Sequence, residues 1–340
     1  MKTPSKVFFH QQAPWSPSWG EDCLLIFDRR LSRHPSFARW SRRFPAAYAV
    51  TAGESLKDIG VFPKHVKAIS RLAGPMASRR LTIVVAGGGS VGDFGGFVAS
   101  VFKRGVRLVQ VPTTWLAAID SAHGGKNGLN VGGAKNQIGT IYPAAEIHVV
   151  RAFLETQGPE RAREAAGEIL KINLLKKIPS AKGDLWRSLP RVIAGKMSIV
   201  RRDPLEKSGV RHLLNFGHTM GHVFEAALSL PHGSAVGYGL VFAVAYSRAK
   251  GLCAAKDYEK IIADPLWSLF IPSRDYLDCL GLPPARVKGL LLKDKKRTAG
   301  DKLRFIFLKK PGQPVIREVG VDEILRELKR QKDLLRSVYG

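Results

Sequence analysis

The sequence predicts an α/β domain over residues 1–150, followed by a mainly α-helical domain over residues 151–340. In the first part, short β-rich runs alternate with helix-like stretches, as in βαβ units that build a mainly parallel sheet. After residue 151, apolar residues recur with the period of an amphipathic helix. A chain of 340 residues of which 45% are hydrophobic is long and apolar enough for two packed cores.

Four strands are expected in the first part. Runs rich in Val, Ile and Leu that end at polar or glycine-rich turns lie at residues 23–28, 81–86, 106–114 and 145–150. The stretch 62–74 lies between two of these runs and has the pattern of a helix. This alternation is what makes the sheet mainly parallel.

The second part consists mostly of helix-forming sequence. A first helix is expected over residues 159–177, where Pro159 is followed by good helix formers. Further helices are expected over residues 185–200, 210–228, 234–250, 284–293 and 322–337. Only residues 302–309 have the composition of a strand.

The chain is strongly basic. It has 54 Lys and Arg against 28 Asp and Glu, a formal net charge of +26, which suits a nucleic acid, an anionic membrane or an anionic substrate. The basic residues are scattered, with no run of five, and no zinc-finger or RNA-recognition motif is present. We therefore expect no nucleic-acid partner, since an anionic substrate or a generally basic proteome explains the charge as well.

The cysteine content indicates a reducing compartment. Cys23, Cys253 and Cys279 are far apart and odd in number, so they form no disulfide framework. No secretory signal is evident, and no stretch reaches the roughly 18 apolar residues of a membrane span. These features predict a cytoplasmic protein with no membrane partner.

A glycine-rich turn follows the second predicted strand. Gly87, Gly89 and Gly92 match the spacing G-x-G-x-x-G directly before a helix, whose free N–H groups can bind a pyrophosphate. The acidic residue that usually follows about 20 positions later is replaced by a neighbourhood containing Arg104 and Arg107. The turn is either a Rossmann-like nucleotide site of unusual plan or simply a tight connection between strand and helix.

A second loop, residues 111–139, combines glycines with basic and polar side chains. Lys126, Lys135, Asn136 and Asp120 lie on backbone too rich in glycine to be helix or strand throughout. Such side chains suit an anionic phosphate. The alternative is a solvated basic loop.

The segment "NFGHTMGH" places His218 and His222 one helical turn apart among small residues. Two interpretations remain open from these residues alone. The histidines form a metal and proton-transfer site, or the small residues mark a contact between helices that happens to contain histidine.

These motifs together resemble the sugar phosphate cyclases, and most of all the 3-dehydroquinate synthase family. The resemblance spans about residues 80–240 with near-complete spacing and, more loosely, almost the whole chain. The matching residues are Gly87-Gly88-Gly89, Gly92-Asp93, Gly96-Phe97, Arg104-Gly105, Val111-Pro112-Thr113-Thr114, Asp120-Ser121, Gly124-Gly125-Lys126 and Lys135-Asn136.

The resemblance implies a metal site and a division of labour between the two histidines. Glu168, His218 and His232 are implied ligands of one Zn or Co ion, a donor set suited to zinc with an open position. His222 is left for the substrate phosphate and for proton transfer. The implied catalytic residues are His222, Lys126, Lys171, Asp120 and Glu206.

The resemblance also implies contacts to NAD and to an anionic substrate. The implied NAD contacts are Asp28, Glu54, Lys57, Gly88, Gly89, Asp93, Thr113, Thr114, Asp120 and Lys135. The implied substrate contacts are Arg104, Lys126, Lys135, Asn136, Lys196, Arg211, Asn215, His222 and Lys296, with Lys295 in reserve. Arg211 and Asn215, four residues apart, are expected on one helical face.

The implied activity converts 3-deoxy-D-arabino-heptulosonate 7-phosphate to 3-dehydroquinate and phosphate, a step of aromatic amino acid biosynthesis in the shikimate pathway. Transient oxidation by NAD, β-elimination of phosphate, reduction and an intramolecular aldol reaction follow one another, in a protein expected to be a homodimer. The alternatives are a sister cyclase with another product, or a metal-dependent polyol dehydrogenase of related architecture.

Several positions depart from the family pattern. Ser234 replaces a carboxylate, Asn127 stands where Thr is usual, Ala134 replaces a glycine, and His123 replaces a small apolar residue. One extra residue lies between Asp203 and Arg211, and the usual opening pair of strands is not evident at the N-terminus. None of these departures touches an implied metal ligand.

Overall fold

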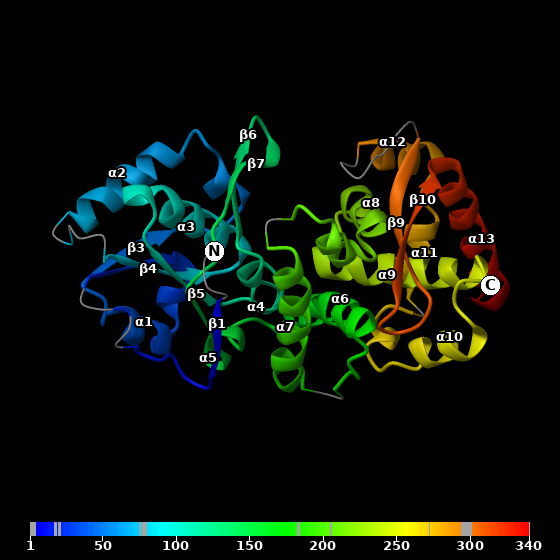
Figure 1. Ribbon diagram of the computed structural model, residues 1–340, viewed down its shortest axis with the longest axis horizontal. Helices are drawn as coiled ribbons and strands as arrows, with labels where there is room; N and C mark the ends of the chain where they lie inside the picture. The colour runs from blue at the N-terminus through cyan, green and yellow to red at the C-terminus, as the bar shows by residue number, and fades with distance from the viewer. Residues whose placement is uncertain are drawn as a thin grey trace. The chain divides into compact units, whose positions relative to one another are not determined.

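The computed structural model describes residues 5–16, 19, 22–74, 76, 80–181, 184–204, 206–271, 273–293 and 301–339. The chain divides into two compact units, Met1–Arg161 and Ala162–Gly340 (Figure 1). The first is α/β and the second mainly helical, so the predicted fold class is confirmed.

The first unit contains a six-stranded sheet of order β1-β8-β5-β4-β2-β3 whose paired strands all run parallel. Its strands are β1 (Lys6–His10), β2 (Cys23–Asp28), β3 (Ala46–Val50), β4 (Thr82–Gly87), β5 (Arg107–Pro112) and β8 (Glu146–Val150). Every residue of β2, β4 and β8 is buried, as expected for strands covered on both faces. The glycine-rich turn leaves the carboxyl end of the central strand β4.

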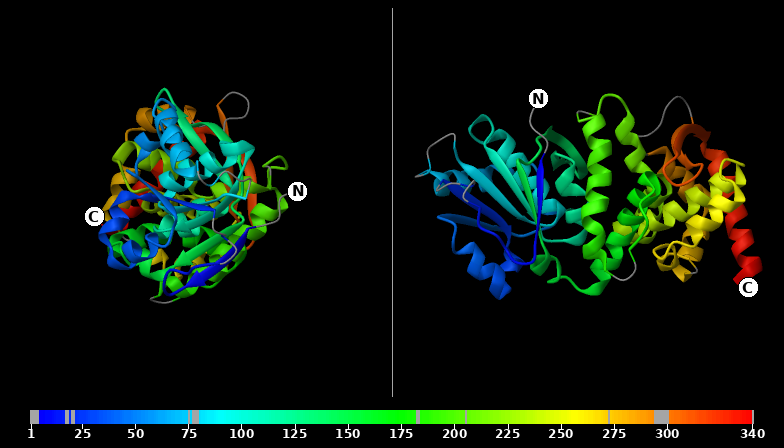
Figure 2. Two further views of the ribbon diagram at one scale, coloured as in Figure 1. Left: turned by 90° about the vertical axis from the view of Figure 1, so that its left-hand side faces the viewer. Right: turned by 60° about the horizontal axis from the view of Figure 1, so that its bottom comes forward.

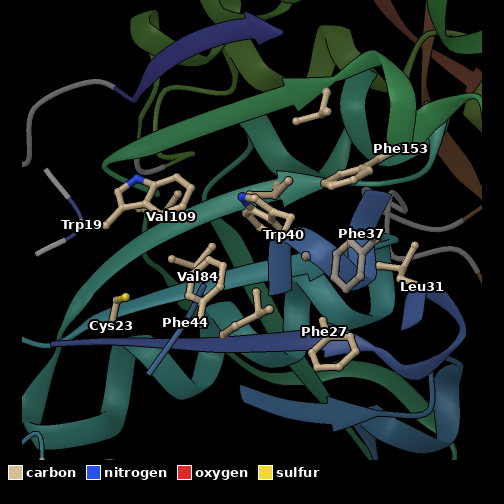
Figure 3. Close-up of a cluster of buried hydrophobic side chains, with 14 residues drawn as sticks. Trp19, Cys23, Phe27, Leu31, Phe37, Trp40, Phe44, Val84, Val109 and Phe153 are labelled. Carbon is tan, nitrogen blue, oxygen red and sulfur yellow. The ribbon is translucent and has the colours of Figure 1, made fainter. Parts of the chain in front are cut away.

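Helices cover both faces of this sheet (Figure 2). They are α1 (Pro35–Ser41), α2 (Phe62–Ala73), α3 (Gly89–Val101), α4 (Trp115–Ile119) and α5 (Arg151–Leu154). On one face, Phe37 and Trp40 of α1 contact Phe153 of α5, with ring centroids 5.2 and 5.5 Å apart (Figure 3). On the opposite face, a Cβ at Gly95 of α3 would lie 2.6 Å from Val85, so this glycine lets the helix approach β4 closely.

Three strand features of the first unit were not predicted. β1 and β3 add edge strands to the sheet, and the glycine-rich loop contains most of an antiparallel hairpin of β6 (Lys126–Val131) and β7 (Ala134–Ile141). The hairpin turns at Gly132 and Gly133, whose φ values of 56° and 79° suit a two-residue turn between strands. The abundance of glycine masked the hairpin because it weakens the period-two pattern of strands.

The described residues after the first unit form helices and a hairpin. The helices are α6 (Pro159–Lys176), α7 (Leu185–Arg202), α8 (His218–Leu228), α9 (His232–Ala249), α10 (Ala255–Ile262), α11 (Arg274–Leu280), α12 (Pro284–Leu292) and α13 (Val321–Tyr339). The predicted strand at 302–309 is β9 (Lys302–Leu308), and the unpredicted β10 (Pro314–Gly320) pairs with it antiparallel. No helix among the described residues is long and apolar enough to cross a membrane.

The helix predicted over residues 210–228 is divided in two. A 3₁₀ helix, η6 (Val210–Asn215), is followed by Gly217 in the left-handed region, with φ 79°, and then by α8. A 3₁₀ helix has three residues per turn, so Arg211 and Asn215 do not share a face through α-helical spacing. The expectation for this pair was wrong because the segment that carries both residues is a 3₁₀ helix and not an α-helix.

Candidate metal and nucleotide sites

Glu168, His218 and His232 meet within the second unit. One carboxylate oxygen of Glu168 lies 3.5 Å from Nε2 of His218 and 3.7 Å from Nε2 of His232. Two atoms that each lie about 2.1 Å from a zinc ion at the tetrahedral angle are about 3.4 Å apart. The three donor atoms are therefore spaced like ligands of one ion rather than like hydrogen-bond partners.

The surroundings of Glu168 test whether a metal fits there. The residue is 1% exposed on α6, and neither carboxylate oxygen accepts a hydrogen bond of acceptable geometry from the described residues. Its charged neighbour is Lys171, one helical turn further on, which forms an ion pair with the second oxygen. Lys171 supplies positive charge at the second oxygen only, and the first oxygen faces the two imidazoles, so a further cation fits between these three donor atoms.

Close packing of helix backbones brings the two histidines to Glu168. His218 and His232 are the first residues of α8 and α9. A Cβ at Gly239 of α9 would lie 2.0 Å from the carbonyl oxygen of Gly217, and a Cβ at Gly233 would lie 1.6 Å from that of Glu164 on α6. The small residues of "NFGHTMGH" therefore do make a helix contact, and the same contact brings His218 and His232 together, so the interpretation as a metal site stays a prediction.

Glu225 is a member of this site that the sequence reasoning missed. Its carboxylate lies 2.8 Å from Nδ1 of His232, on the ring edge opposite the atom that faces Glu168. Burial lowers the pKa of His232, but the carboxylates of Glu168 and Glu225 outweigh burial and raise the pKa to about 10. The signal available in the sequence was the spacing of Glu225 three residues after His222, on one face of α8.

His222 lies beside the cluster. Its ring centroid is 5.3 Å from that of His218 and 6.0 Å from that of His232. His222, Glu225 and His232 also form a second group with donor atoms within 4.8 Å of one another. Because Nδ1 of His232 already contacts Glu225, we interpret Glu225 as orienting the imidazole, as carboxylates do for metal-bound histidines.

The other implied residues of the second unit occupy α7 and the segment before α8. Lys196 and Arg211 are each 4% exposed. The Arg211 guanidinium donates to the carbonyl of Pro204 at 3.3 Å, and its backbone N–H donates to Asp203 at 3.4 Å. Glu206 adopts a left-handed φ of 57°. Lys295 and Lys296 lie outside the described residues.

In the first unit, the glycine-rich turn borders a pocket. Gly88 precedes α3, which begins at Gly89, so free N–H groups of the helix start lie at this turn. The pocket is lined by Gly87, Gly88, Gly92, Asp93, Gln110, Pro112, Ala117, Ser121, Ala122, Lys126 and Asn127. It thus joins the glycine turn to the base of the β6–β7 hairpin.

Thr113 and Thr114 follow β5 next to this pocket. Thr113 is buried, and the hydroxyl of Thr114 accepts a hydrogen bond of 3.1 Å from the N–H of Ala117, capping α4. Asp120 is the C-cap residue of the same helix. Asp28 caps the 3₁₀ helix after β2 and accepts hydrogen bonds from the backbone and side chain of Arg30.

Two further implied residues of the first unit, Lys135 and Arg104, are exposed. Lys135 is exposed on β7 and Arg104 is exposed after α3. Lys103 and Arg104 have φ of 49° and 67°, an unusual pair of left-handed residues outside glycine. Such conformations persist where the surrounding fold holds them, and they gather at functional sites.

Asn127, a departure from the family pattern, fills a specific space. A Cβ at Gly96 would lie 1.8 Å from the Asn127 side-chain oxygen, so the amide packs directly against α3. Its nitrogen donates to the carbonyls of Gly125 and Tyr142, each at 3.1 Å. Asn127 thereby closes the base of the hairpin. Ser234 is half-buried on α9, and Ala134 is exposed.

The architecture and these sites define the class first. The chain combines a parallel α/β unit that has a glycine-rich turn with a helical unit that has a Glu-His-His cluster, and solved sugar phosphate cyclases share this fold. Models of the 3-dehydroquinate synthase N-terminal and C-terminal domains match residues 47–164 and 166–297. The chain belongs to the 3-dehydroquinate synthase family.

Curated relatives agree with this membership. The 3-dehydroquinate synthase of Cereibacter sphaeroides is 34% identical over 301 residues, 83% of this chain and 80% of that protein. The 3-dehydroquinate synthase of Saccharolobus solfataricus is 33% identical over 273 residues, 75% of this chain and 74% of that protein.

Solved structures show the same fold at lower identity. A 2-deoxy-scyllo-inosose synthase, solved with carbaglucose-6-phosphate, NAD⁺ and Co²⁺, has a TM-score of 0.79 at 22% identity and covers 95% of this chain and 96% of its own. The 2-epi-5-epi-valiolone synthase of Streptomyces hygroscopicus, solved with NAD⁺ and Zn²⁺, has a TM-score of 0.78 at 21% identity over 98% of each chain.

Proposed function

We propose that this protein is a 3-dehydroquinate synthase, which converts 3-deoxy-D-arabino-heptulosonate 7-phosphate to 3-dehydroquinate and phosphate. The observation that carries the proposal is the cluster of Glu168, His218 and His232, set in a chain that belongs to the family over both of its units. Curated relatives that cover most of the chain have this activity in their names.

NAD and one divalent ion, Zn or Co, are the cofactors that we infer. The cluster supports the metal, since Glu168 is a buried carboxylate facing two imidazoles. The pocket beside Gly88 and Asp93 supports the nucleotide. When bound, NAD accepts and returns a hydride, and the metal polarises the oxygen at the carbon that is oxidised.

The chain's own residues bind and orient an anionic substrate in this proposal. Lys126 and Lys135 on the hairpin bring positive charge for the phosphate, and Asn136 adds an amide. Arg211 and Lys196 hold the carboxylate, the guanidinium through two parallel hydrogen bonds. His222, next to the cluster, exchanges protons with the leaving phosphate or with the carbon chain.

Lys171 and Glu225 each contact a proposed metal ligand and not the substrate. Lys171 balances the charge of Glu168, and Glu225 fixes the ring of His232. Asp120 and Glu206 are our candidates for general acid–base catalysis. Each is a carboxylate that lies a few residues along the chain from a proposed substrate residue of its own unit.

We also propose that the protein is a homodimer located in the cytoplasm. In this proposal Arg104, which is exposed and has left-handed backbone, contributes to the phosphate site of a second subunit. The three cysteines are buried and free, as in a reducing compartment. Light scattering after size exclusion tests the dimer, and a monomeric active enzyme contradicts it.

The decisive experiment follows phosphate release from the heptulosonate phosphate with NAD⁺ and Zn²⁺ or Co²⁺. We expect 3-dehydroquinate as product, a requirement for NAD⁺ and no net NADH. Stoichiometric NADH would instead support a polyol dehydrogenase, and turnover only of a different phosphorylated sugar would support a sister cyclase.

A matched pair of histidine variants completes this experiment. His218→Ala should lose both bound metal and activity, because one of three donors is gone. His34→Ala, which changes a half-buried histidine of the first unit far along the chain from every implied ligand, should keep both. Unchanged metal content in His218→Ala contradicts the assignment.

A further inference from the structure

Lys57 lies at the centre of a hydrogen-bonded network within the first unit. Its ammonium donates to the carboxylate of Asp93 at 2.7 Å and to the side-chain oxygen of Asn136 at 2.6 Å. Glu54, one turn earlier, lies 4.0 Å away. Three separate segments, the 3₁₀ helix η3 (Glu54–Lys57), α3 and β7, therefore meet at one nitrogen atom.

Burial makes these contacts hard to replace. The side chain of Lys57 is 4% exposed and that of Asp93 is 22% exposed. A buried ammonium needs an opposite charge and hydrogen-bond acceptors, and removing one partner leaves the other charge uncompensated. Asp93 supplies the charge and Asn136 an acceptor, so the ion pair extends to the hairpin.

Asn136 is held from a second side. Its backbone N–H donates to the side-chain oxygen of Asn130 at 2.9 Å, and Asn130 in turn donates to Glu54 at 2.8 Å. Asn136 adopts a left-handed φ of 54°, which is uncommon outside glycine and requires support from its surroundings. The network thus fixes the part of β7 that carries Lys135 and Asn136.

The other end of the network lies in the pocket. Asp93 lines the pocket with the glycines of the turn, and Lys126 of β6 lines it too. β6 and β7 are paired strands of one hairpin, with Lys126 opposite Ile141. A ligand in the pocket and an anion bound by the hairpin therefore both contact side chains that belong to this one network or lie next to it.

We propose that Lys57 is a positioning residue that couples the nucleotide pocket to the lysine-bearing hairpin, so that NAD⁺ and a phosphate-bearing substrate bind with positive cooperativity. This inference rests on the proposed function for the identity of the two ligands. Its physical basis is that both ligands contact parts of one network: the ligand that binds first restricts the remaining motion of the network, and the second then loses less conformational entropy. Such coupling is reciprocal and commonly amounts to about five- to 150-fold in affinity.

The test measures the dissociation constant of NAD⁺ by calorimetry, with and without saturating inorganic phosphate as the anionic probe. In the unmodified protein we expect phosphate to tighten NAD⁺ binding about fivefold or more. In Lys57→Met the ratio of the two constants should fall to about one. Lys67→Met, which removes an exposed lysine of α2, is the matched control and should keep the coupling.

A second variant guards against a folding defect in Lys57→Met. Asn136→Ala leaves the ion pair of Lys57 and Asp93 in place but cuts its link to the hairpin. Asn136 does not line the pocket. Because Asn136 is also a proposed phosphate contact, the phosphate affinity of the variant is measured first and phosphate is raised to saturate it, so that only the ratio of the two NAD⁺ constants is compared. Weaker coupling between NAD⁺ and phosphate in this variant therefore supports the inference, whereas unchanged coupling overturns it.

The outcomes separate this inference from the proposed function. NAD⁺ binding that is indifferent to phosphate in the unmodified protein overturns the coupling while leaving the synthase proposal intact. Coupled binding without release of phosphate from the heptulosonate phosphate overturns the synthase proposal and leaves the coupling intact. Absence of any NAD⁺ binding overturns both.

Discussion

Glu225 is expected to orient the ring of His232, a proposed metal ligand. Glu225→Gln keeps the shape of the side chain but removes the charge that holds Nδ1 of His232. We expect affinity for Zn²⁺ to fall about ten- to 100-fold, because such partners fix the tautomer and orientation of the ring. Competition with a chromophoric chelator measures the change.

The control for this prediction is Glu259→Gln, which removes an exposed carboxylate from α10 of the same unit. It should bind Zn²⁺ as the unmodified protein does. If Glu225→Gln instead lowers the number of ions bound per chain from two to one, Glu225 is a ligand of a second ion rather than an orienting group.

A substitution of Arg211 tests whether this residue binds the substrate carboxylate. A lysine at this position cannot form the two parallel hydrogen bonds of a guanidinium. Losing one hydrogen bond to a charged group, about 1.5–3 kcal/mol, lowers kcat/KM about ten- to 100-fold or more. We expect Arg211→Lys to show this loss in steady-state assays while binding metal and NAD⁺ normally.

A substrate analogue without the carboxylate provides the control for Arg211→Lys. The substitution should lower kcat/KM far more for the normal substrate than for the analogue. Equal losses with both would argue that Arg211, which contacts Pro204 and Asp203, supports the fold before α8 instead.

At the scale of elements, the contact between α8 and α9 determines the geometry of the histidine cluster. Gly239→Ala places a methyl group 2.0 Å from the Gly217 carbonyl, so the helices must separate. We expect a loss of about 1–3 kcal/mol in the free energy of unfolding, the usual range for overpacking, together with weaker metal binding. Chemical denaturation and metal titration measure the two effects.

Gly289 offers a matched comparison on α12. A Cβ there meets nothing within 4 Å, and the residue is helical. Gly289→Ala should therefore stabilise the protein by about 0.5–1 kcal/mol, since alanine is the better helix former. If both variants change the free energy of unfolding by the same amount, the close contact at Gly239 does not limit the size of the residue there.

The edge strand β1 makes the first unit sensitive to acid. His10 of β1 lies 3.0 Å from His148 of β8, whose other ring nitrogen lies 3.1 Å from Glu146. Burial lowers the pKa of His148 and of His10, despite the help of Glu146 to His148. Both imidazoles are therefore neutral in the folded protein at pH 7.

The sign of the effect follows from these lowered pKa values. The unfolded chain takes up protons at about pH 6.5, before the folded one does, so stability is present above that pH and is lost as the pH falls. We expect the melting temperature to drop between pH 7 and pH 5, and to drop less in His148→Gln. An equal drop in both proteins would place the acid sensitivity elsewhere.

The elements also show what could be predicted from the sequence. Strand β4 could be predicted because it is a short apolar run, rich in β-branched residues, that ends at glycines. Helix α6 could be predicted because its apolar residues recur with a helical period over 18 residues. The candidate metal site was inferred only from the resemblance to a family, since Glu168, His218 and His232 are far apart along the chain. The β6–β7 hairpin and the Asn130 contacts were missed because tertiary contacts, not local propensity, fix them.

At the scale of the whole molecule, the excess of positive charge affects binding of an anionic substrate. With a net charge of +26, long-range attraction should raise the local concentration of a substrate carrying phosphate and carboxylate. We expect kcat/KM to fall several-fold as NaCl is raised from about 0.01 to 0.3 M, because screening shortens the Debye length from about 30 Å to below 8 Å, while kcat changes little. An uncharged osmolyte is the control, and a kcat/KM that ignores salt would contradict the expectation.

The pairing of β1 with β8 also has a consequence for how the protein is made. Lys6 lies opposite Glu146, so the first strand of the chain pairs with a strand about 140 residues later. At about 5–20 residues per second, a ribosome needs roughly 7–30 s to produce that partner. During this interval β1, with Phe8 and His10, has no neighbouring strand with which to pair. Chaperones that shield emerging chains therefore have a defined window in which they matter for this protein, and it closes when β8 leaves the exit tunnel.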